Sequence, residues 1–430
     1  MRVIIDAHIH SKYSRATSQD MNIQSIARFA HVKGLNVVGT GDFTHPRWLG
    51  ELKEILEETF PGSGLYKPRG SPEAGVDFML TAEVSTIFEF EGKSRRVHHV
   101  IWCPNIETAE QINDALSKYG SLLEDGRPTL TLSAPQLVEE VLGLSEDNFI
   151  FPAHAWTPWF SIFGAFSGFD RFEDCYQDQS RRVYALETGL SSDPPMNWRV
   201  SSLDRLAIIS NSDCHSAWPW RLGREANILE LEELTYRSIV DAVRSKNPKQ
   251  LLFTIETDPA YGKYHWTGHR GCNVSMPPEE AIRSGNSCPV CGRRMTKGVQ
   301  QRVDELADRP PDYRPKGSPG YVHLLPLSEI IATAIGTDSP ASQRVWDHYN
   351  LLITRFGNEY NVLLNASSEE LRRTVDLKIA DLITRVREDK VRVIPGYDGV
   401  YGRLELENEE ASKVSMRRAK GGRTLLSDFI

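Results

Sequence analysis

A pattern in the first half of this 430-residue chain limits its possible folds: short apolar segments run directly into histidine or acidic residues. The first such segment, Val3–Ile5, leads into His8 and His10. Side chains of a strand alternate between its two faces, so these imidazoles point the same way and can chelate one divalent metal. Later segments end similarly. The candidate metal ligands at these strand ends are His8, His10, Asp42, Glu83, His98, His154, Asp213 and His215.

Helical patterns separate several of these strands. Residues 20–33 have apolar positions at helical spacing before Gly34, and similar patterns occupy residues 107–118 and 134–142, the last after a candidate N-cap at Ser133. Alternating strands and helices predict an α/β fold with a parallel sheet, and about seven such units predict a closed or nearly closed (β/α)7 barrel. Active sites of such barrels lie at the carboxyl ends of the strands, where the candidate ligands fall.

The candidate ligands favour metal-assisted hydrolysis. No Ser-His-Asp or Cys-His set suited to nucleophilic catalysis stands out, and no glycine-rich phosphate loop precedes a helix. Hydrolysis of a phosphodiester needs an activated water and neutralisation of the phosphate charge, and two or three divalent metals supply both. Glu83 is the best candidate for a carboxylate that bridges two metals, and Asp213 is assigned a catalytic role with it. His215 would complete the set from the last strand.

Three of the six cysteines form a second candidate metal site. Cys288 and Cys291 lie in a Cys-Pro-x-Cys-Gly sequence, and His269 and Cys272 have the same two-residue gap. Three cysteines and one histidine predict a closed, tetrahedral, structural Zn²⁺ site in a small zinc-ribbon domain. His265 is the alternative fourth ligand. Such a cluster indicates a reducing compartment rather than a disulfide framework.

Helical patterns dominate the chain from residue 326. A capping-box sequence at Ser367 and Glu370 predicts a helix that continues through Val386. Arg372 and Arg373 lie on this helix, and two interpretations remain open: a solvated surface or a stripe that contacts phosphates.

Two further segments are candidates for substrate contacts. Trp156–Phe172 is rich in aromatic residues, and it is either a loop packed on the barrel or a wall on which an extruded base stacks. Asp193 follows the strand that ends near Glu187, and it is a candidate for substrate binding.

The last residues form a basic segment, Lys413–Arg423, followed by Leu426, Phe429 and Ile430. A basic segment with few apolar residues is typical of disorder, and a short apolar cluster at its end is a natural ligand for a groove. The Leu-x-x-Phe-Ile spacing resembles the motif that docks on DNA sliding clamps. The alternative is a tail that packs on its own domain.

Composition bounds the location of the protein. Hydrophobic residues make up 40% of the chain, and no apolar run approaches the roughly 18 residues of a membrane span. The N-terminus lacks the pattern of a secretory signal. We therefore expect a soluble, cytoplasmic protein with no membrane partner. The net charge of -8 argues mildly against indiscriminate binding of polyanions, without excluding a local basic groove.

The strand-end residues resemble those of the PHP (polymerase and histidinol phosphatase) domain over about residues 1–240. The family marks are the His-x-His of His8 and His10, then Asp42, Glu83, His98, His154, and the Asp-x-His of Asp213 and His215. The resemblance implies a distorted barrel with a cluster of two or three divalent metals, Zn²⁺, Mg²⁺ or Mn²⁺. Phe43 stands where the family usually has histidine, so a third metal depends on Asp42 or His45. The pair His98–His99 leaves two candidates for one ligand, and His98 is preferred.

The order of domains resembles the endonuclease Q family across essentially the whole chain. The motifs are GHRGC at 268–272, CPVCGRRMTKGV at 288–299, RVDELADR at 302–309 and PGYDGVYG at 395–402. The resemblance implies a DNA repair endonuclease that nicks on the 5′ side of deaminated bases (hypoxanthine, uracil, xanthine) and abasic sites. It also implies a sliding-clamp partner, PCNA or the bacterial β-clamp, bound through the tail.

The predicted organisation has four parts: residues 1–247, the catalytic domain; 248–310, the zinc-binding domain; 311–411, the helical DNA-binding domain; and 412–430, the tail. The sequence leaves two other functions open. One is a PHP-type phosphatase acting on a small phosphate ester, which would need neither a zinc ribbon nor a basic tail. The other is a non-catalytic adaptor between DNA and the clamp, which would not need an intact set of ligands.

Overall fold

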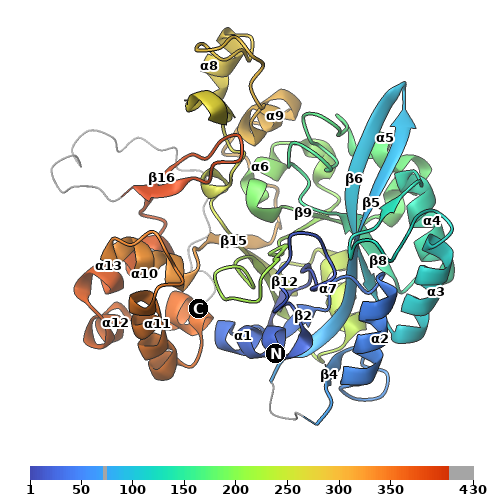
Figure 1. Cartoon of the computed structure of the whole chain (residues 1–430), viewed down its shortest axis with the longest axis horizontal. Coiled ribbons are helices and arrows are strands. Elements are labelled where there is room, and N and C mark those ends of the chain that lie inside the picture. The colour runs from blue at the N-terminus through green and yellow to red at the C-terminus, as the bar shows by residue number, and fades with distance from the viewer. Residues whose placement is uncertain (71–74, 406–430) are drawn as a thin grey trace.

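The computed structural model describes residues 1–70 and 75–405 and has a mixed α/β architecture around a large sheet (Figure 1). Along its hydrogen-bonded path the sheet runs β15, β12, β11, β1, β2, β5, β4 and β3, and β6, β7 and β8 join it through β5 and β6. The strands of this sheet are β1 (Arg2–Asp6), β2 (Val37–Gly39), β3 (Leu56–Glu58), β4 (Tyr66–Pro68), β5 (Asp77–Phe90), β6 (Lys93–Cys103), β7 (Thr129–Leu130), β8 (Phe149–Pro152), β11 (Ala226–Glu230), β12 (Leu251–Glu256) and β15 (Gly320–His323).

The helices cover this sheet and form the C-terminal part of the chain. Those next to the barrel strands are α1 (Ile23–Lys33), α2 (Pro46–Ile55), α3 (Ile106–Leu116), α4 (Ala134–Leu144), α5 (Phe172–Tyr176), α6 (Pro194–Trp198) and α7 (Tyr236–Ser245). Those further along the chain are α8 (Pro278–Arg283), α9 (Val299–Leu306), α10 (Leu327–Ile335), α11 (Gln343–Phe356), α12 (Ser368–Thr374) and α13 (Leu377–Arg387).

The strands whose ends carry the candidate ligands are joined in a circuit. β1 pairs with β2, β2 with β5, β5 with β6, and β6 with β8. Two further strands, β9 (Ala185–Glu187) and β10 (Ala207–Ile209), pair with each other. The Ala155 N–H donates to the Glu187 carbonyl at one side of this pair, and the Asp213 N–H donates to the His8 carbonyl at the other. These contacts bring the ends of β1, β5, β6, β8, β9 and β10 to one region, and the predicted distorted barrel stays a prediction.

The pairing is mixed, which corrects the prediction of a parallel sheet. β1–β2 and β2–β5 are parallel, but β5–β6, β6–β8 and β1–β11 are antiparallel. No crossover helix separates β5 from β6. They are joined at Glu91 and Gly92, whose φ angles of 50° and 71° are typical of a tight hairpin turn. Strands joined by such a turn must run antiparallel.

Local capping explains where several helices begin and end. Ser133 and Gln136 form a capping box at α4, and Ser367 and Glu370 form one at α12, as the sequence predicts. Gly34 ends α1 with a φ of 96°. The prediction of one continuous helix from Ser367 through Val386 is wrong. The helix is interrupted at Val375, whose backbone is extended, so that α12 and α13 are separate helices.

One core joins the barrel to the C-terminal helices. The buried cluster that contains Val3 of β1 also contains Ile379 of α13. At the junction, the buried Lys33 ammonium lies 2.7 Å from the Glu359 carboxylate, which also accepts a hydrogen bond from the Tyr349 hydroxyl. This ion pair ties α1 to the C-terminal helices.

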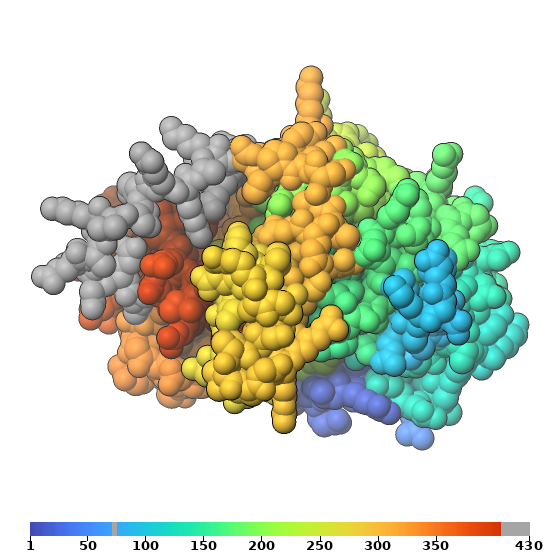
Figure 2. Space-filling view, turned by 90° about the horizontal axis from the view of Figure 1, so that it is seen from above, coloured from blue at the N-terminus to red at the C-terminus, as the bar shows by residue number. Residues whose placement is uncertain are grey.

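The predicted zinc ribbon lies on the hairpin β13 (Thr267–His269) and β14 (Val274–Met276), followed by α8, and has a small core of its own around Ala281, Cys288 and Met295. In Figure 2 these residues, yellow to gold, lie between the C-terminal elements and the barrel on the face shown. A last hairpin, β16 (Arg392–Ile394) and β17 (Arg403–Glu405), follows α13.

The predicted domain boundaries stay predictions. β12 and β15 lie beyond residues 247 and 310, yet both extend the sheet that begins with β1. Within the described ranges, the helices are too short or too polar to cross a bilayer.

Candidate metal centre and active site

Four of the predicted ligands converge where β1, β5 and β10 meet. His8, His10, Glu83 and Asp213 each offer an atom within 4.8 Å of the others. His10 Nε2 lies 3.2 Å from Glu83 Oε2 and 3.0 Å from Asp213 Oδ1, and His8 Nε2 lies 3.8 Å from each of these oxygens. Two imidazoles and two carboxylates at these distances can enclose one divalent ion.

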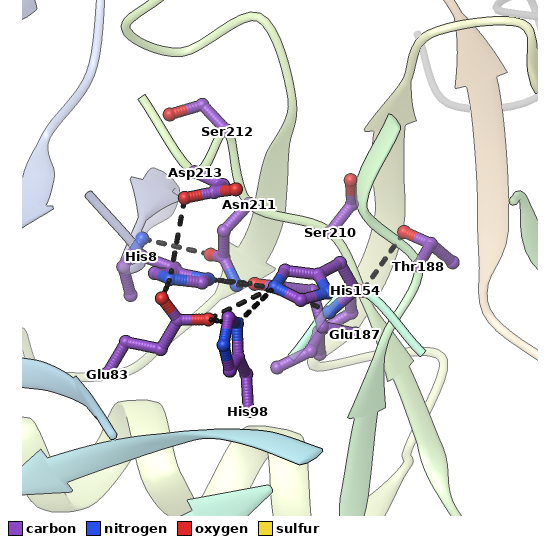
Figure 3. Close-up of polar contacts among 12 residues, drawn as sticks. His8, Glu83, His98, His154, Glu187, Thr188, Ser210, Asn211, Ser212 and Asp213 are labelled. Carbon is purple, nitrogen blue, oxygen red and sulfur yellow. Dashed lines mark hydrogen bonds and ion pairs between the residues drawn. The ribbon is translucent and has the colours of Figure 1, made fainter. Parts of the chain in front are cut away.

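Glu83 belongs to a second group as well. Its other oxygen, Oε1, lies 2.9 Å from His98 Nδ1 and 3.0 Å from His154 Nε2, and the two imidazole nitrogens are 3.2 Å apart. Figure 3 shows the side chains of His8, Asp213, His98 and His154 directed toward the Glu83 carboxylate. One carboxylate between two sets of ligands is the arrangement that the sequence predicts for a bridged pair of metals.

Three buried atoms test whether metals fit these groups. His8 Nε2, His10 Nε2 and Asp213 Oδ1 are buried and make no hydrogen bond with the described residues. A buried polar atom without a partner costs about 1–3 kcal/mol. Because the three atoms face one another, one bound cation would give all of them a partner. The residues present therefore fit a divalent metal.

Two carboxylates behind the imidazoles orient the ligands. Glu187 Oε1 and Oε2 both lie 3.0 Å from His8 Nδ1, and Asn211 donates to Oε1 over 2.8 Å. Asp42 Oδ1 lies 3.0 Å from His10 Nδ1. A carboxylate on the far nitrogen fixes the tautomer and leaves Nε2 free for a metal.

Asp42 thus lies behind His10 rather than within either group of converging atoms. Its second oxygen accepts hydrogen bonds from the Ser11 N–H and from the Ser11 and Ser14 hydroxyls, over 2.6–2.9 Å. These contacts use the carboxylate fully. The sequence analysis assigned no role to Glu187. Its position at the end of a strand is the signal that could have identified it.

The two adjacent histidines of β6 face opposite ways. His98 lies at the Glu83 carboxylate. His99 is buried on the other face, where its ring nitrogens lie 3.0 Å from the Thr86 hydroxyl and 2.8 Å from the Tyr176 hydroxyl. The alternation of strand side chains therefore places His98, the preferred candidate, at the site.

The residues that could serve a third metal are engaged elsewhere. Phe43 is fully buried and apolar. His45 Nδ1 accepts from the Trp48 N–H at the start of α2, and its Nε2 contacts the Leu123 carbonyl. His215 lies beside the first group, with Nδ1 3.0 Å from the Asp213 carbonyl, but it does not join the converging atoms.

Charge in the group is set by its neighbours. Although burial opposes ionisation, His98 and the Arg127 guanidinium hold the pKa of Glu83 well below its usual range. Burial also opposes ionisation of Asp213, whose pKa is nonetheless held well below its usual range by His10. Burial lowers the pKa of His98 to about 4, so this imidazole is neutral at pH 7. For His8, His10 and His154 the direction is opposite: although burial opposes protonation, neighbouring carboxylates raise their pKa values, so a divalent metal would compete with protons for these ring nitrogens.

Strained backbone marks the same strand ends. Asp42, His154 and Asp213 are non-glycine residues with φ angles of 50°, 29° and 46°. Such angles cost about 1–3 kcal/mol and persist where the surroundings enforce them, often at functional sites. Here they re-aim side chains just after their strands end.

The four predicted ligands of the zinc ribbon also come together. His269, Cys272, Cys288 and Cys291 form one group within 4.8 Å, and His269 Nδ1 lies 3.4 Å from Cys291 Sγ. Although burial opposes it, the backbone N–H groups of Cys291 and Val290 lower the pKa of Cys288 to about 6. A thiolate at Cys288 suits a tetrahedral structural Zn²⁺, whereas the neighbouring cysteines raise the pKa of Cys272 to about 11, so its thiol would lose a proton when the metal binds. The alternative ligand, His265, is not part of the group.

A cavity of about 610 Å³ opens beside the first group of ligands. Asp213, His154 and His215 line it on the metal side. Half of its other lining residues are aromatic or basic, namely Trp159, Tyr264, Tyr401, Arg221, Arg224 and Lys263.

Other predicted contact residues lie apart from these ligands. Asp193 Oδ1 accepts the Met196 N–H at the start of α6, and its Oδ2 lies 3.1 Å from His323 Nε2. Arg372 pairs with Asp381 at the surface, and Arg373 pairs with Glu369. Leu426, Phe429 and Ile430, the predicted clamp-binding residues, lie outside the described residues.

The fold and these groups define an α/β protein with buried candidate metal ligands at its strand ends, where two groups share Glu83, and one cysteine-rich group of candidate metal ligands. Residues 326–390 match the family described as the MJ0043 C-terminal domain. The chain is 34% identical over 264 residues to the uncharacterized protein MJ0043 of Methanocaldococcus jannaschii, a match that covers 60% of this chain but 32% of that protein. It is 28% identical over 382 residues to the uncharacterized protein YqxK of Bacillus subtilis, covering 87% of this chain and 89% of that one.

Two solved structures match along nearly the whole chain. The lesion-specific endonuclease PfuEndoQ from Pyrococcus furiosus superposes with a TM-score of 0.84 at 34% identity, covering 97% of this chain and 98% of that one. Endonuclease Q in complex with a 27-mer duplex substrate that has an abasic lesion at the active site superposes with a TM-score of 0.85 at 34% identity, covering 97% and 99%. The chain therefore belongs to the endonuclease Q family, as its motifs predict.

Proposed function

We propose that this protein is a metal-dependent DNA repair endonuclease that hydrolyses the phosphodiester on the 5′ side of deaminated bases (hypoxanthine, uracil, xanthine) and abasic sites. Membership of the endonuclease Q family supports the class of reaction, and one solved relative is in complex with duplex DNA that has an abasic lesion. The observation that carries the proposal is the bridged ligand set beside a cavity lined by aromatic and basic side chains.

The ligand residues have distinct roles in this reaction. His8, His10, Glu83 and Asp213 would hold one divalent metal, and Glu83 with His98 and His154 would hold another. Bound divalent metals activate water at neutral pH and neutralise charge on the phosphate. Glu187 and Asp42 keep the two imidazoles of the His-x-His pair in the orientation that this requires.

The cavity suits a nucleotide turned out of the duplex. Its volume falls within the roughly 300–1,000 Å³ of typical small-molecule sites. Trp159 lines it and stacks on Phe166 at 5.0 Å between ring centroids, and both rings are about 40% exposed. An exposed aromatic pair offers a surface on which a base can stack, and Lys263 and Arg221 add positive charge for phosphates.

The test is cleavage of labelled duplexes that contain hypoxanthine, uracil, an abasic site or no lesion, with Mg²⁺, Mn²⁺ or Zn²⁺. We expect a single nick on the 5′ side of each lesion and none in the undamaged duplex. Equal cleavage of undamaged DNA would reject the damage-specific function. Hydrolysis of a small phosphate ester with no cleavage of DNA would favour the phosphatase instead.

The tail and the arginines of α12 extend the proposal to partners. Removal of residues 423–430 is expected to leave nicking intact and to abolish binding to a sliding clamp, measured by pull-down with the purified clamp. Retained clamp binding would reject the role of Leu426, Phe429 and Ile430.

Arg372 and Arg373 are each paired with an acidic neighbour, so their contribution to DNA binding should be small.

A further inference from the structure

An arginine that sequence reasoning did not single out contacts the bridging carboxylate. Arg127 Nη1 lies 3.0 Å from Glu83 Oε2, the oxygen that also faces His10. Glu83 is fully buried, whereas 27% of the Arg127 side chain is exposed. The guanidinium therefore touches the metal centre from a position that solvent can reach.

The loop that presents Arg127 is fixed against two strand ends. The Gly126 N–H donates to the Tyr13 carbonyl over 3.0 Å, and the Gly126 carbonyl accepts from the Thr44 hydroxyl over 3.2 Å. A Cβ at Gly126 would come within 2.4 Å of Asp42 Oδ2, so the backbone approaches closer than any other residue would allow. The residue before Arg127 is thus packed against the carboxylate that orients His10.

Among the described residues, the groups of three or more candidate ligands near this arginine are the two that share Glu83. The buried Phe43 offers no ligand, and His45 is used in capping α2. His215 Nδ1 lies 3.8 Å from Asp213 Oδ1, an oxygen that already belongs to the first group. Arg127 supplies the positive charge at this edge of the centre.

We propose that Arg127 takes the place of a third metal ion: the centre holds two metals, and the Arg127 guanidinium binds a non-bridging oxygen of the scissile phosphate. This inference rests on the proposed hydrolysis of a phosphodiester. A guanidinium has five N–H donors, so one nitrogen can hold the Glu83 carboxylate while another binds phosphate. Unlike a metal, it keeps its charge without ligands and cannot be removed by a chelator.

The experiment uses the full, zinc-loaded chain and two readouts that do not depend on DNA. Metal content by plasma mass spectrometry should give two equivalents beyond the one in the zinc ribbon, in wild type and in Arg127→Gln alike. Titration calorimetry with inorganic phosphate should show affinity reduced about 10- to 100-fold in Arg127→Gln, the loss of a charge-assisted hydrogen bond. Arg15→Gln is the matched control, because this arginine is 77% exposed and pairs with Asp125 of the same loop.

Two results would overturn the proposal: a third equivalent of metal in the wild-type centre, or unchanged phosphate affinity in Arg127→Gln. Arg127→Lys keeps the charge but loses the planar fork, and its affinity should fall about 3- to 10-fold even if the glutamine variant does not fold. Affinity equal to that of wild type would contradict the inference. Failure of wild type to cut damaged DNA would reject the proposed function, whereas the metal and phosphate measurements would still decide the role of Arg127.

Discussion

The strand-end site and the predicted zinc ribbon differ both in their candidate ligands and in their surroundings: the first has imidazoles and carboxylates, and the second has three thiols and one imidazole. His8 and His10 are at most 1% exposed, each is held by a carboxylate, and the nearby apolar core is large. In the ribbon, Cys291 is exposed, and the buried core of Ala281, Cys288 and Met295 is small. The barrel brings its ligands together by packing, whereas the ribbon has little but its ligands to hold it.

This difference predicts different uses of metal. A set of four thiolate and imidazole ligands fills the coordination of Zn²⁺ and leaves no place for a substrate. The barrel groups share Glu83 and lie beside the cavity, so a substrate can reach them. Metal should therefore contribute chemistry in the barrel and stability in the ribbon.

The largest expected effect is on catalysis in the barrel. Asp213→Ala removes one of two carboxylates from the first group, and we expect kcat for nicking to fall by at least about 1,000-fold, because metal ions carry the reaction. DNA affinity, measured by fluorescence anisotropy, should change less than about threefold. Asp114→Ala on the exposed face of α3 is the control and should cut normally. Cleavage by Asp213→Ala at the wild-type rate would remove this residue from the site.

Removal of metal should separate the two regions. Chelation, or Cys288→Ser, is expected to unfold the ribbon locally, since structural zinc sites derive most of their folding energy from the metal. Hydrogen exchange should show loss of amide protection in β13 and β14 and retained protection in β5. If both regions lose protection together, the barrel depends on its metals for folding, and the comparison is wrong.

A smaller effect, on metal affinity, is expected from the carboxylate that orients a ligand histidine. Glu187→Gln keeps the shape of the side chain but removes the charge that orients His8, and loss of such a partner weakens metal binding by about 10- to 100-fold. Competition with a fluorescent chelator measures this affinity. Glu139→Gln, on the exposed side of α4, is a matched control. An unchanged affinity would mean that packing alone orients His8.

Sequence patterns predicted the candidate ligands because strand periodicity and strand ends are local. The shared face of His8 and His10 follows from the alternation of side chains along β1. Alternation along β6 puts His98 and His99 on opposite faces, but only the structure shows that His98 is the one at Glu83. The ribbon follows from spacing alone. The antiparallel pairing was missed because the tight turn at Glu91 and Gly92 offered no strong signal against a crossover.

The residues that serve the ligands were harder to predict. Arg127 lies in a loop without periodicity, and only tertiary contacts of that loop bring it to Glu83. Asp42 has the residue type and place of a ligand, and only its distance to His10 Nδ1 shows that it orients the ring. Contacts between side chains distant in sequence leave no local pattern.

A third group of candidate metal ligands differs from the other two sites, because its histidine is already paired with an aspartate outside the group. Asp258, His323 and Asp389 lie within 4.8 Å of one another, but His323 Nε2 lies 3.1 Å from Asp193 Oδ2.

Although burial opposes protonation, the surrounding aspartates raise the pKa of His323 to about 9, from an ordinary value of 6.5. A raised pKa gives stability that is full below pH 6.5 and lost as pH rises through 9, on the order of 3 kcal/mol. Urea unfolding of wild type and His323→Gln should therefore differ at pH 6 and converge near pH 10, with or without chelator. A difference independent of pH would show that His323 stabilises the protein without its charge.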